Sequence, residues 1–154
     1  MTFNVVSGLP SCMQLLHQLF YFLDESSDEP LLALFAAEGI WHRQGVRLVG
    51  REQIRRALSA RSKTQRIRHV ISNGFIESQT QGLIQFVAYM TAYRFDDGVL
   101  RTGPLEISRP LRLSVVRAAI RQSDNGFEFD ALSITAEFDF VSEAARGEAA
   151  VAAA

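Results

Sequence analysis

Cysteine is almost absent from this chain, since Cys12 is its one member. A lone cysteine excludes an internal disulfide and a cysteine-based zinc framework, and we expect Cys12 to be chemically inert. The three histidines are scattered without metal-ligand spacing, and the glycines form no phosphate-binding motif. The sequence therefore predicts neither a metal site nor a cofactor.

Long apolar runs are also missing. No window reaches the roughly eighteen apolar residues that a membrane-spanning helix requires. The first residues lack the basic segment and apolar core of a secretory signal. These two observations predict a cytoplasmic protein with no membrane partner.

Neither sign of charge is in excess, because sixteen Lys and Arg face seventeen Asp and Glu for a net charge of −1. One local run is basic, with seven Lys or Arg between Arg51 and Arg68 against the single acidic Glu52. The run contains no interleaved aromatic residue on which a base could stack. We interpret it as the solvated face of a helix and its following loop, and we expect no nucleic-acid partner.

Aromatic residues are abundant by contrast, with eleven Phe, three Tyr and one Trp. So many aromatics in a short chain predict a wide aromatic core or the wall of a pocket. Hydrophobic residues at 47% and charged residues at 21% are typical of a globular protein, and 154 residues suit one core. We expect a single domain over residues 1–141 and a flexible Ala-rich tail over residues 142–154.

Along the chain, the predicted helices lie mostly before the long predicted strands. Apolar periodicity and capping signals indicate helices at residues 11–23, 28–39 and 51–60. The first opens at a capping-box pattern, Ser11 followed by Gln14, and Gly39 ends the second. The apolar surface of the first helix is wider than one stripe, so we expect it to be buried on more than one side.

Six strands are predicted from alternating apolar residues and turn signals, at residues 40–43, 46–49, 66–77, 83–95, 111–122 and 127–140. Residues 99–110 contain two Pro and read as a loop. In the last strand the apolar positions change from odd, ending at Ala131, to even, beginning at Leu132. A strand with a side-chain period of two needs a bulge or bend for this. The pattern predicts an α+β fold, a cone-shaped roll of helices on a strongly curved, mostly antiparallel sheet.

A family resemblance rests on motifs in the middle of the chain: Trp41-x-Arg43-x-Gly45, Gly50-x-x-x-Ile54 and Arg68-His69-x-Ile71-x-Asn73. With these motifs the chain resembles SnoaL-like proteins of the nuclear transport factor 2-like superfamily over about residues 10–141. The resemblance implies the cystatin-like roll of that superfamily. It leaves function open, because relatives include scytalone dehydratase, ketosteroid isomerase, polyketide cyclases and non-catalytic dioxygenase β subunits.

Only some of the catalytic residues of these relatives have a counterpart in this chain. His69 matches the strand histidine that scytalone dehydratase uses as acid and base. The position of that enzyme's helix aspartate holds Tyr21, and that of its second histidine holds Val87. The place of the ketosteroid isomerase aspartate holds His42 or Arg43, whereas Tyr21 is similar to that enzyme's helix tyrosine.

The candidate catalytic residues are His69, Tyr21 and Asp24. His69 shares strand parity with Ile67 and Ile71, so it would face an apolar interior, where a histidine can act as a general base. Tyr21 would donate a hydrogen bond to a developing oxyanion, and Asp24 would orient the imidazole. The alternative is structural: His69 as a hydrogen-bonded core histidine, Asp24 as a helix end and Tyr21 as a packed aromatic.

The candidate ligand-binding residues are Trp41, Arg43, Phe86, Tyr89 and Tyr93. The aromatic members would form pocket walls, as strand parity allows. Arg43 would bind an anionic ligand group or stabilise an oxyanion. Alternatively, it would form a structural salt bridge to a carboxylate such as Glu38 or Asp28.

Two functions remain open at this point. The first is a cofactor-free lyase or isomerase that acts on a small, largely apolar cyclic or polyketide-like molecule. The second is a non-catalytic ligand-binding or assembly domain similar to a dioxygenase β subunit. An open pocket would favour the first and a filled cone the second. The resemblance implies a homodimer packed through the sheet in either case.

Overall fold

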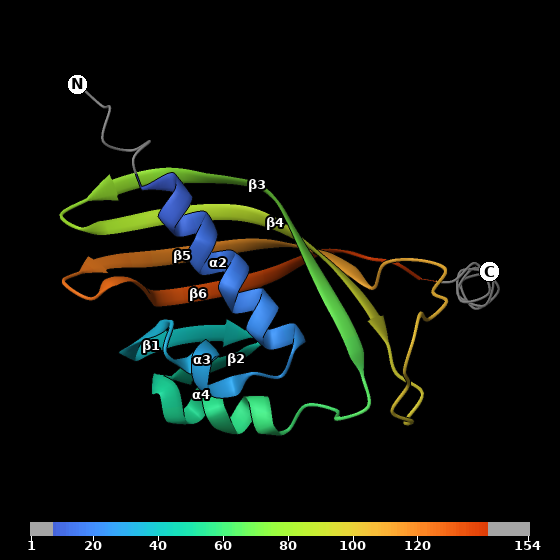
Figure 1. Ribbon diagram of the computed structural model, residues 1–154. Coiled ribbons are helices and arrows are strands. Elements are labelled where there is room, and N and C mark those ends of the chain that lie inside the picture. Colours follow the sequence, from blue (N-terminus) through green and yellow to red (C-terminus); the bar gives the residue numbers. More distant parts are fainter. Residues whose placement is uncertain (1–7, 142–154) are drawn as a thin grey trace, which may run out of the picture.

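The computed structural model describes residues 8–141, which form three helices and one six-stranded sheet (Figure 1). The helices are α2 (Leu9–Asp24), α3 (Asp28–Leu32) and α4 (Gly50–Ser59). The strands are β1 (Phe35–Arg43), β2 (Val46–Val49), β3 (Arg66–Thr80), β4 (Leu83–Phe95), β5 (Arg112–Ser123) and β6 (Gly126–Asp139). The predicted α+β class is confirmed, whereas the predicted tail at residues 142–154 lies outside the described residues.

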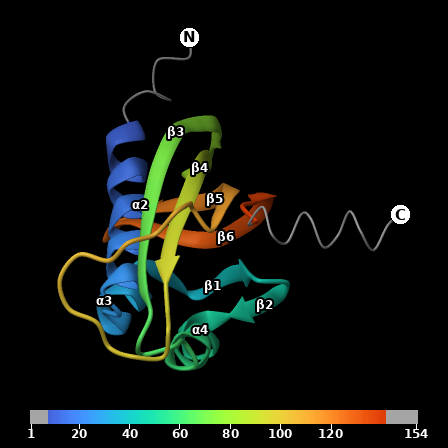
Figure 2. The ribbon, with the colours of Figure 1, turned by 90° about the vertical axis from the view of Figure 1, so that its right-hand side faces the viewer.

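The sheet has the order β2-β1-β6-β5-β4-β3. Every neighbouring pair is antiparallel except β1 and β6, which run parallel. Figure 2 shows the sheet curving around α2, which lies along its concave face. Because the sheet partly encloses the helix, α2 buries a broad surface made of Cys12, Leu15, Leu16, Leu19, Phe20 and Leu23. This arrangement confirms the expected burial on more than one side.

Bulges bend the long strands. Opposite β5, the register of β6 shifts between Phe129 and Ala131, and the buried positions change from Phe129 to Leu132. The phase change predicted in the last strand is therefore confirmed. In β3 a second irregularity follows Ser72, where Asn73 adopts a φ of +55°. Extra residues at such points increase strand bending and twist, so the sheet can close into a cone.

Two predicted boundaries are wrong. The second helix ends at Leu32, and residues 35–39 belong to β1 instead. The cause is a long-range pairing: the Phe129 N–H donates to the Leu34 carbonyl at 2.8 Å, and Phe35 aligns with Phe129 in β6. The first helix begins at Leu9 without a side-chain cap, so the predicted capping box of Ser11 is not formed.

The narrow end of the cone is a packed core. Its largest fully buried side chains on the sheet include Phe35, Phe86, Phe129, Ile84 and Ile120. Across the residues that the structure describes, no helix has the length and apolar character needed to span a bilayer.

Gly39 lies where β1 bulges against β6, and we expect its replacement by alanine to destabilise the protein. A Cβ atom there would lie 2.9 Å from the Phe129 carbonyl oxygen and 3.0 Å from that of Ala36. Both obstacles are backbone, so Gly39→Ala should lower the free energy of unfolding by about 1–3 kcal/mol. Urea denaturation measures this. As a control, Gly8→Ala meets only ordinary contacts, the nearest at 3.4 Å, and should cost clearly less; equal losses would contradict the steric explanation.

Candidate functional site

A cavity of about 750 Å³ occupies the wide end of the cone. This volume lies within the range of small-molecule sites. Its walls come from α2, from the segment between α4 and β3, and from the inward faces of β1, β3, β4, β5 and β6. Apolar contributors to the walls include Phe20, Leu23, Ile67, Met90 and Ile134. The cone is therefore open at one end rather than filled throughout.

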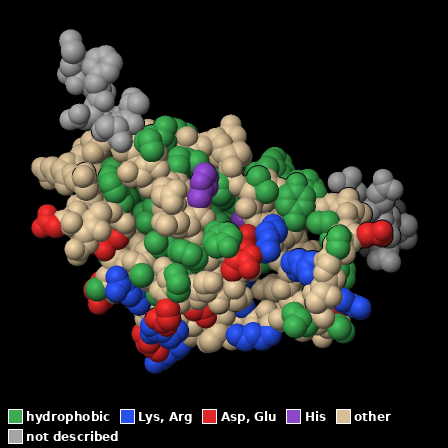
Figure 3. Space-filling view, in the orientation of Figure 1, with side chains coloured by type: hydrophobic (Ala, Val, Ile, Leu, Met, Phe, Trp, Pro, Cys, Tyr) green, Lys and Arg blue, Asp and Glu red, His purple; other side chains and the backbone are tan. Residues whose placement is uncertain are grey.

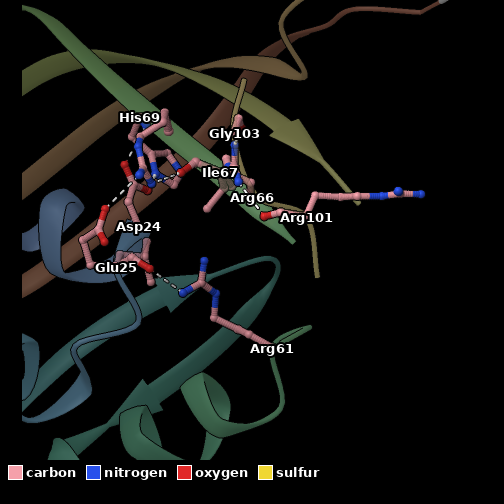
Figure 4. A network of polar contacts seen from close by, with 10 residues as sticks. Asp24, Glu25, Arg61, Arg66, Ile67, His69, Arg101 and Gly103 are labelled. Carbon is pink, nitrogen blue, oxygen red and sulfur yellow. Dashed lines mark hydrogen bonds and ion pairs between the residues drawn. The ribbon is translucent and has the colours of Figure 1, made fainter. Parts of the chain in front are cut away.

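His69 and Asp24 form a hydrogen-bonded pair at the edge of this cavity. The Asp24 carboxylate contacts His69 twice, with Oδ1 2.5 Å from the ring Nδ1 and Oδ2 accepting the backbone N–H at 2.9 Å. The side chains are only 7% and 6% exposed. Figure 4 shows the carboxylate at the end of α2 and the imidazole on β3 directed toward each other. His69 lines the cavity, as its shared parity with Ile67 predicts.

The Asp24 carboxylate determines which nitrogen of the His69 ring carries the proton. An acceptor at Nδ1 favours the tautomer that carries its proton there, which leaves Nε2 with a free lone pair. Nε2 makes no hydrogen bond with any of the described residues, while the face of the ring packs on Phe20 with centroids 4.9 Å apart. The pair therefore has the form of a general base held in position by an acidic partner.

Two further polar groups on the cavity wall have no partner. Trp41 Nε1 and Ser114 Oγ belong to fully buried residues, and neither makes a hydrogen bond within residues 8–141. Both residues line the cavity. A buried donor without an acceptor is costly, and both atoms are covered by neighbouring side chains rather than exposed to the cavity. Ser114 was not identified as a cavity residue from the sequence. Its inward position in β5, between Arg112 and Val116, was a signal that could have identified it.

Four arginines line the cavity, and two of them are ion-paired. Arg94 lies 3.3 Å from a carboxylate oxygen of Asp96, and Arg112 lies 2.6 Å from one of Asp139. The other two are Arg43 and Arg61. Arg61 donates to the Leu23 carbonyl at the end of α2, at 2.6 Å (Figure 4).

Arg43 differs from the other three. Its guanidinium stacks on Trp41, 5.6 Å from the ring centroid, and forms neither a hydrogen bond nor an ion pair with the described residues. The salt bridge to Glu38 or Asp28 that the sequence allowed is not formed. Burial lowers the pKa of Arg43, and the charge of nearby Arg61 lowers it further. Burial also lowers the pKa of Arg61, against the opposing effects of Asp24 and Asp28.

The remaining predicted site residues lie elsewhere. Tyr21 is 63% exposed, because its position on α2 faces away from the sheet, and it does not line the cavity. Phe86 is buried in the core at the closed end. Tyr89 and Tyr93 lie on the outer face of β4, since Met90 and Ala92 between them face the cavity. The structure thus brings together His69, Asp24, Trp41 and Arg43 but not these four aromatics.

The described part of the chain contains no group of three or more His, Cys, Asp or Glu that could hold a metal ion. Around α4 the arginines are paired with acids, as where Arg55 contacts both Glu29 and Glu52. Figure 3 shows basic and acidic side chains mixed over α4 at the lower edge of the molecule. This mixture agrees with a solvated helix face.

Comparison with known proteins gives a family and a fold. A family model described as a SnoaL-like domain matches residues 11–133. No curated protein sequence matches the chain. Among solved structures, a candidate scytalone dehydratase from Novosphingobium aromaticivorans DSM 12444 is similar with a TM-score of 0.72 and 14% identity, over 93% of this chain and 94% of that one.

Two other solved structures are similar at comparable levels. The β subunit of a candidate aromatic-ring-hydroxylating dioxygenase, also from Novosphingobium aromaticivorans DSM 12444, has a TM-score of 0.69 and 10% identity, over 88% of this chain and 93% of that one. A protein with a cystatin-like fold from Nostoc punctiforme PCC 73102 has a TM-score of 0.66 and 20% identity, over 82% of this chain and 88% of that one. At these identities the likeness is one of fold.

Cys12 is excluded as a nucleophile by its surroundings. The residue is fully buried in the core, and burial raises the pKa of its thiol to about 11. At pH 8 the thiol is therefore protonated and shielded, and the native protein should not react with a disulfide reagent such as DTNB. Unfolding in guanidinium should release one equivalent of colour, which serves as the control. Rapid reaction of the native protein would contradict the burial of Cys12.

Proposed function

The chain belongs to the SnoaL-like domain family, and from this premise we propose that it is a lyase or isomerase that moves a proton on a small cyclic or polyketide-like molecule. The observation that carries the proposal is the hydrogen bond between Asp24 and His69 at the wall of an open cavity. His69 is the general acid and base, and Asp24 is the positioning residue that orients its ring. Reactions of this class need only proton transfers, which a histidine can perform without a cofactor.

The steps follow from the geometry of the pair. Nε2 of His69 accepts a proton from a carbon next to a carbonyl, and the electrons of the broken C–H bond move to the carbonyl oxygen as an enolate. Asp24 stabilises the imidazolium that results. In elimination, the enolate re-forms the carbonyl and a new C=C bond while the C–O bond to the β-hydroxyl breaks, and the imidazolium protonates that hydroxyl so that it leaves as water. In isomerisation, the electrons of the enolate form a C–H bond at a different carbon with the proton that the imidazolium returns.

The enolate oxygen requires a hydrogen-bond donor. Tyr21 cannot serve from its exposed position, and Trp41 Nε1 and Ser114 Oγ, the unpaired polar groups of the wall residues, are covered.

The outer face of the sheet carries large exposed hydrophobic side chains, including Val70, Phe75, Tyr89, Tyr93 and Phe138. Such surfaces commonly mark protein interfaces. We propose that a second copy of this chain packs on this face. A non-catalytic assembly role, as for a dioxygenase β subunit, would use the same face but would not need the pair of His69 and Asp24.

Deuterium incorporation tests the catalytic proposal without knowledge of the natural substrate. Cyclic ketones with and without a β-hydroxyl would be incubated with the protein in D₂O and followed by NMR at the α-carbon. We expect His69→Ala to reduce exchange or elimination by about 10²–10⁴-fold, because it removes the base. His17→Ala changes an exposed histidine of α2 and serves as the matched control. Equal rates for wild type and His69→Ala on a turned-over ketone would refute the proposal.

Sedimentation velocity tests the assembly proposal. Tyr89→Lys places a charge on the outer sheet face and should shift the protein from dimer to monomer, since a desolvated unpaired charge opposes association. Gln14→Lys, on an exposed position of α2, should leave the dimer intact. A wild-type protein that is monomeric at all accessible concentrations would remove this part of the proposal.

A further inference from the structure

The cavity has an unbalanced charge on its wall. Of the described residues that line it, four are arginines and none is Asp or Glu. Asp96 pairs with Arg94, and Asp139 pairs with Arg112, from beside the cavity. Arg61 donates a hydrogen bond to the Leu23 carbonyl. Arg43 is left as the guanidinium with no acceptor among the described residues. A half-buried cation in this state is stabilised when an anion binds to it.

We propose that the ligand of this cavity is a carboxylic acid, and that Arg43 binds its carboxylate. Because the same cavity is the proposed active site, the assignment rests on the proposed function and adds its substrate class. A guanidinium presents two parallel N–H donors that match the two oxygens of a carboxylate. Stacking on Trp41 holds the guanidinium plane in place.

The position of Arg43 also orients the ligand. Arg43 ends β1 and His69 lies in β3, and β6, β5 and β4 separate these strands in the sheet order. Curvature of the sheet brings both residues to one cavity. A ligand whose carboxylate binds Arg43 would pack its apolar body against residues such as Met90 and Ile134 in the cavity that His69 also lines. The substrate class is a cyclic or polyketide-like acid.

The chain contains its own probe for the test, because Trp41 is its one tryptophan and lines the cavity. Tryptophan fluorescence would be titrated near neutral pH with adamantane-1-carboxylate and with its neutral amide, adamantane-1-carboxamide. These ligands share one apolar cage and differ in charge. We expect the carboxylate to bind about tenfold tighter or better, the ratio that one charge-assisted contact supplies.

Variants separate the role of Arg43 from general charge. Arg43→Gln should remove most of the preference for the carboxylate and leave amide binding nearly unchanged, and Arg43→Lys should restore part of it. Arg117→Gln is the matched control, because Arg117 is exposed on the outer face of β5 and pairs with Glu77. Equal affinities for the two ligands, an unchanged preference in Arg43→Gln, or no binding of either ligand into the millimolar range would overturn the inference.

Binding and catalysis can fail separately in this design. The titration is repeated in His69→Ala, which lacks the proposed base but retains Arg43. A carboxylate preference there, together with no proton exchange on any ketone or keto acid, would refute the enzyme and leave the anion site standing. Proton exchange that depends on His69 but shows no preference for acids would do the reverse.

Discussion

The contact between the end of α2 and the middle of β3 is the interaction on which the site depends. One carboxylate, that of Asp24, binds both the ring and the backbone of His69. It therefore fixes the position of the helix along the strand as well as the orientation of the imidazole. At the other end of α2 the fit is equally close, since a Cβ on Gly74 would lie 2.3 Å from Met13 Sδ. A helix held at both ends closes the narrow end of the cone and leaves the wide end open.

The distribution of polar groups follows from this division. At the closed end, side chains such as Phe86 and Phe129 pack without polar atoms. At the open end, Trp41 and Ser114 keep polar atoms without partners, and Arg43 keeps a cation without an anion. A core selected only for stability would avoid all three, because each costs free energy in the unliganded protein. Proteins tolerate such costs where a ligand or a reaction uses the groups.

Much of this fold was predictable because its signals are local. Alternation around His69 identified the inward face of β3, and the phase change between Ala131 and Leu132 identified the bend in β6. The start of β1 at Phe35 could not be read in the same way, since its partner Phe129 lies far along the chain. The site was predictable in part for the same reason. The contact of Asp24 with His69 required only the helix end and the strand face, whereas the exposure of Tyr21 depended on how α2 turns against the whole sheet.

The parallel pairing of β1 with β6 also means that the sheet cannot form completely until the last strand has been synthesised. β1 is made early and has only the short β2 as a neighbour until the last strand is available. On the ribosome, Phe35, Trp41 and His42 must wait for residues 129–133 to emerge before their strand gains its second partner. Closing so long a loop late makes this a slow topology. During synthesis the nascent chain thus carries an unpaired strand edge, which is the kind of surface that can pair with a strand of another chain.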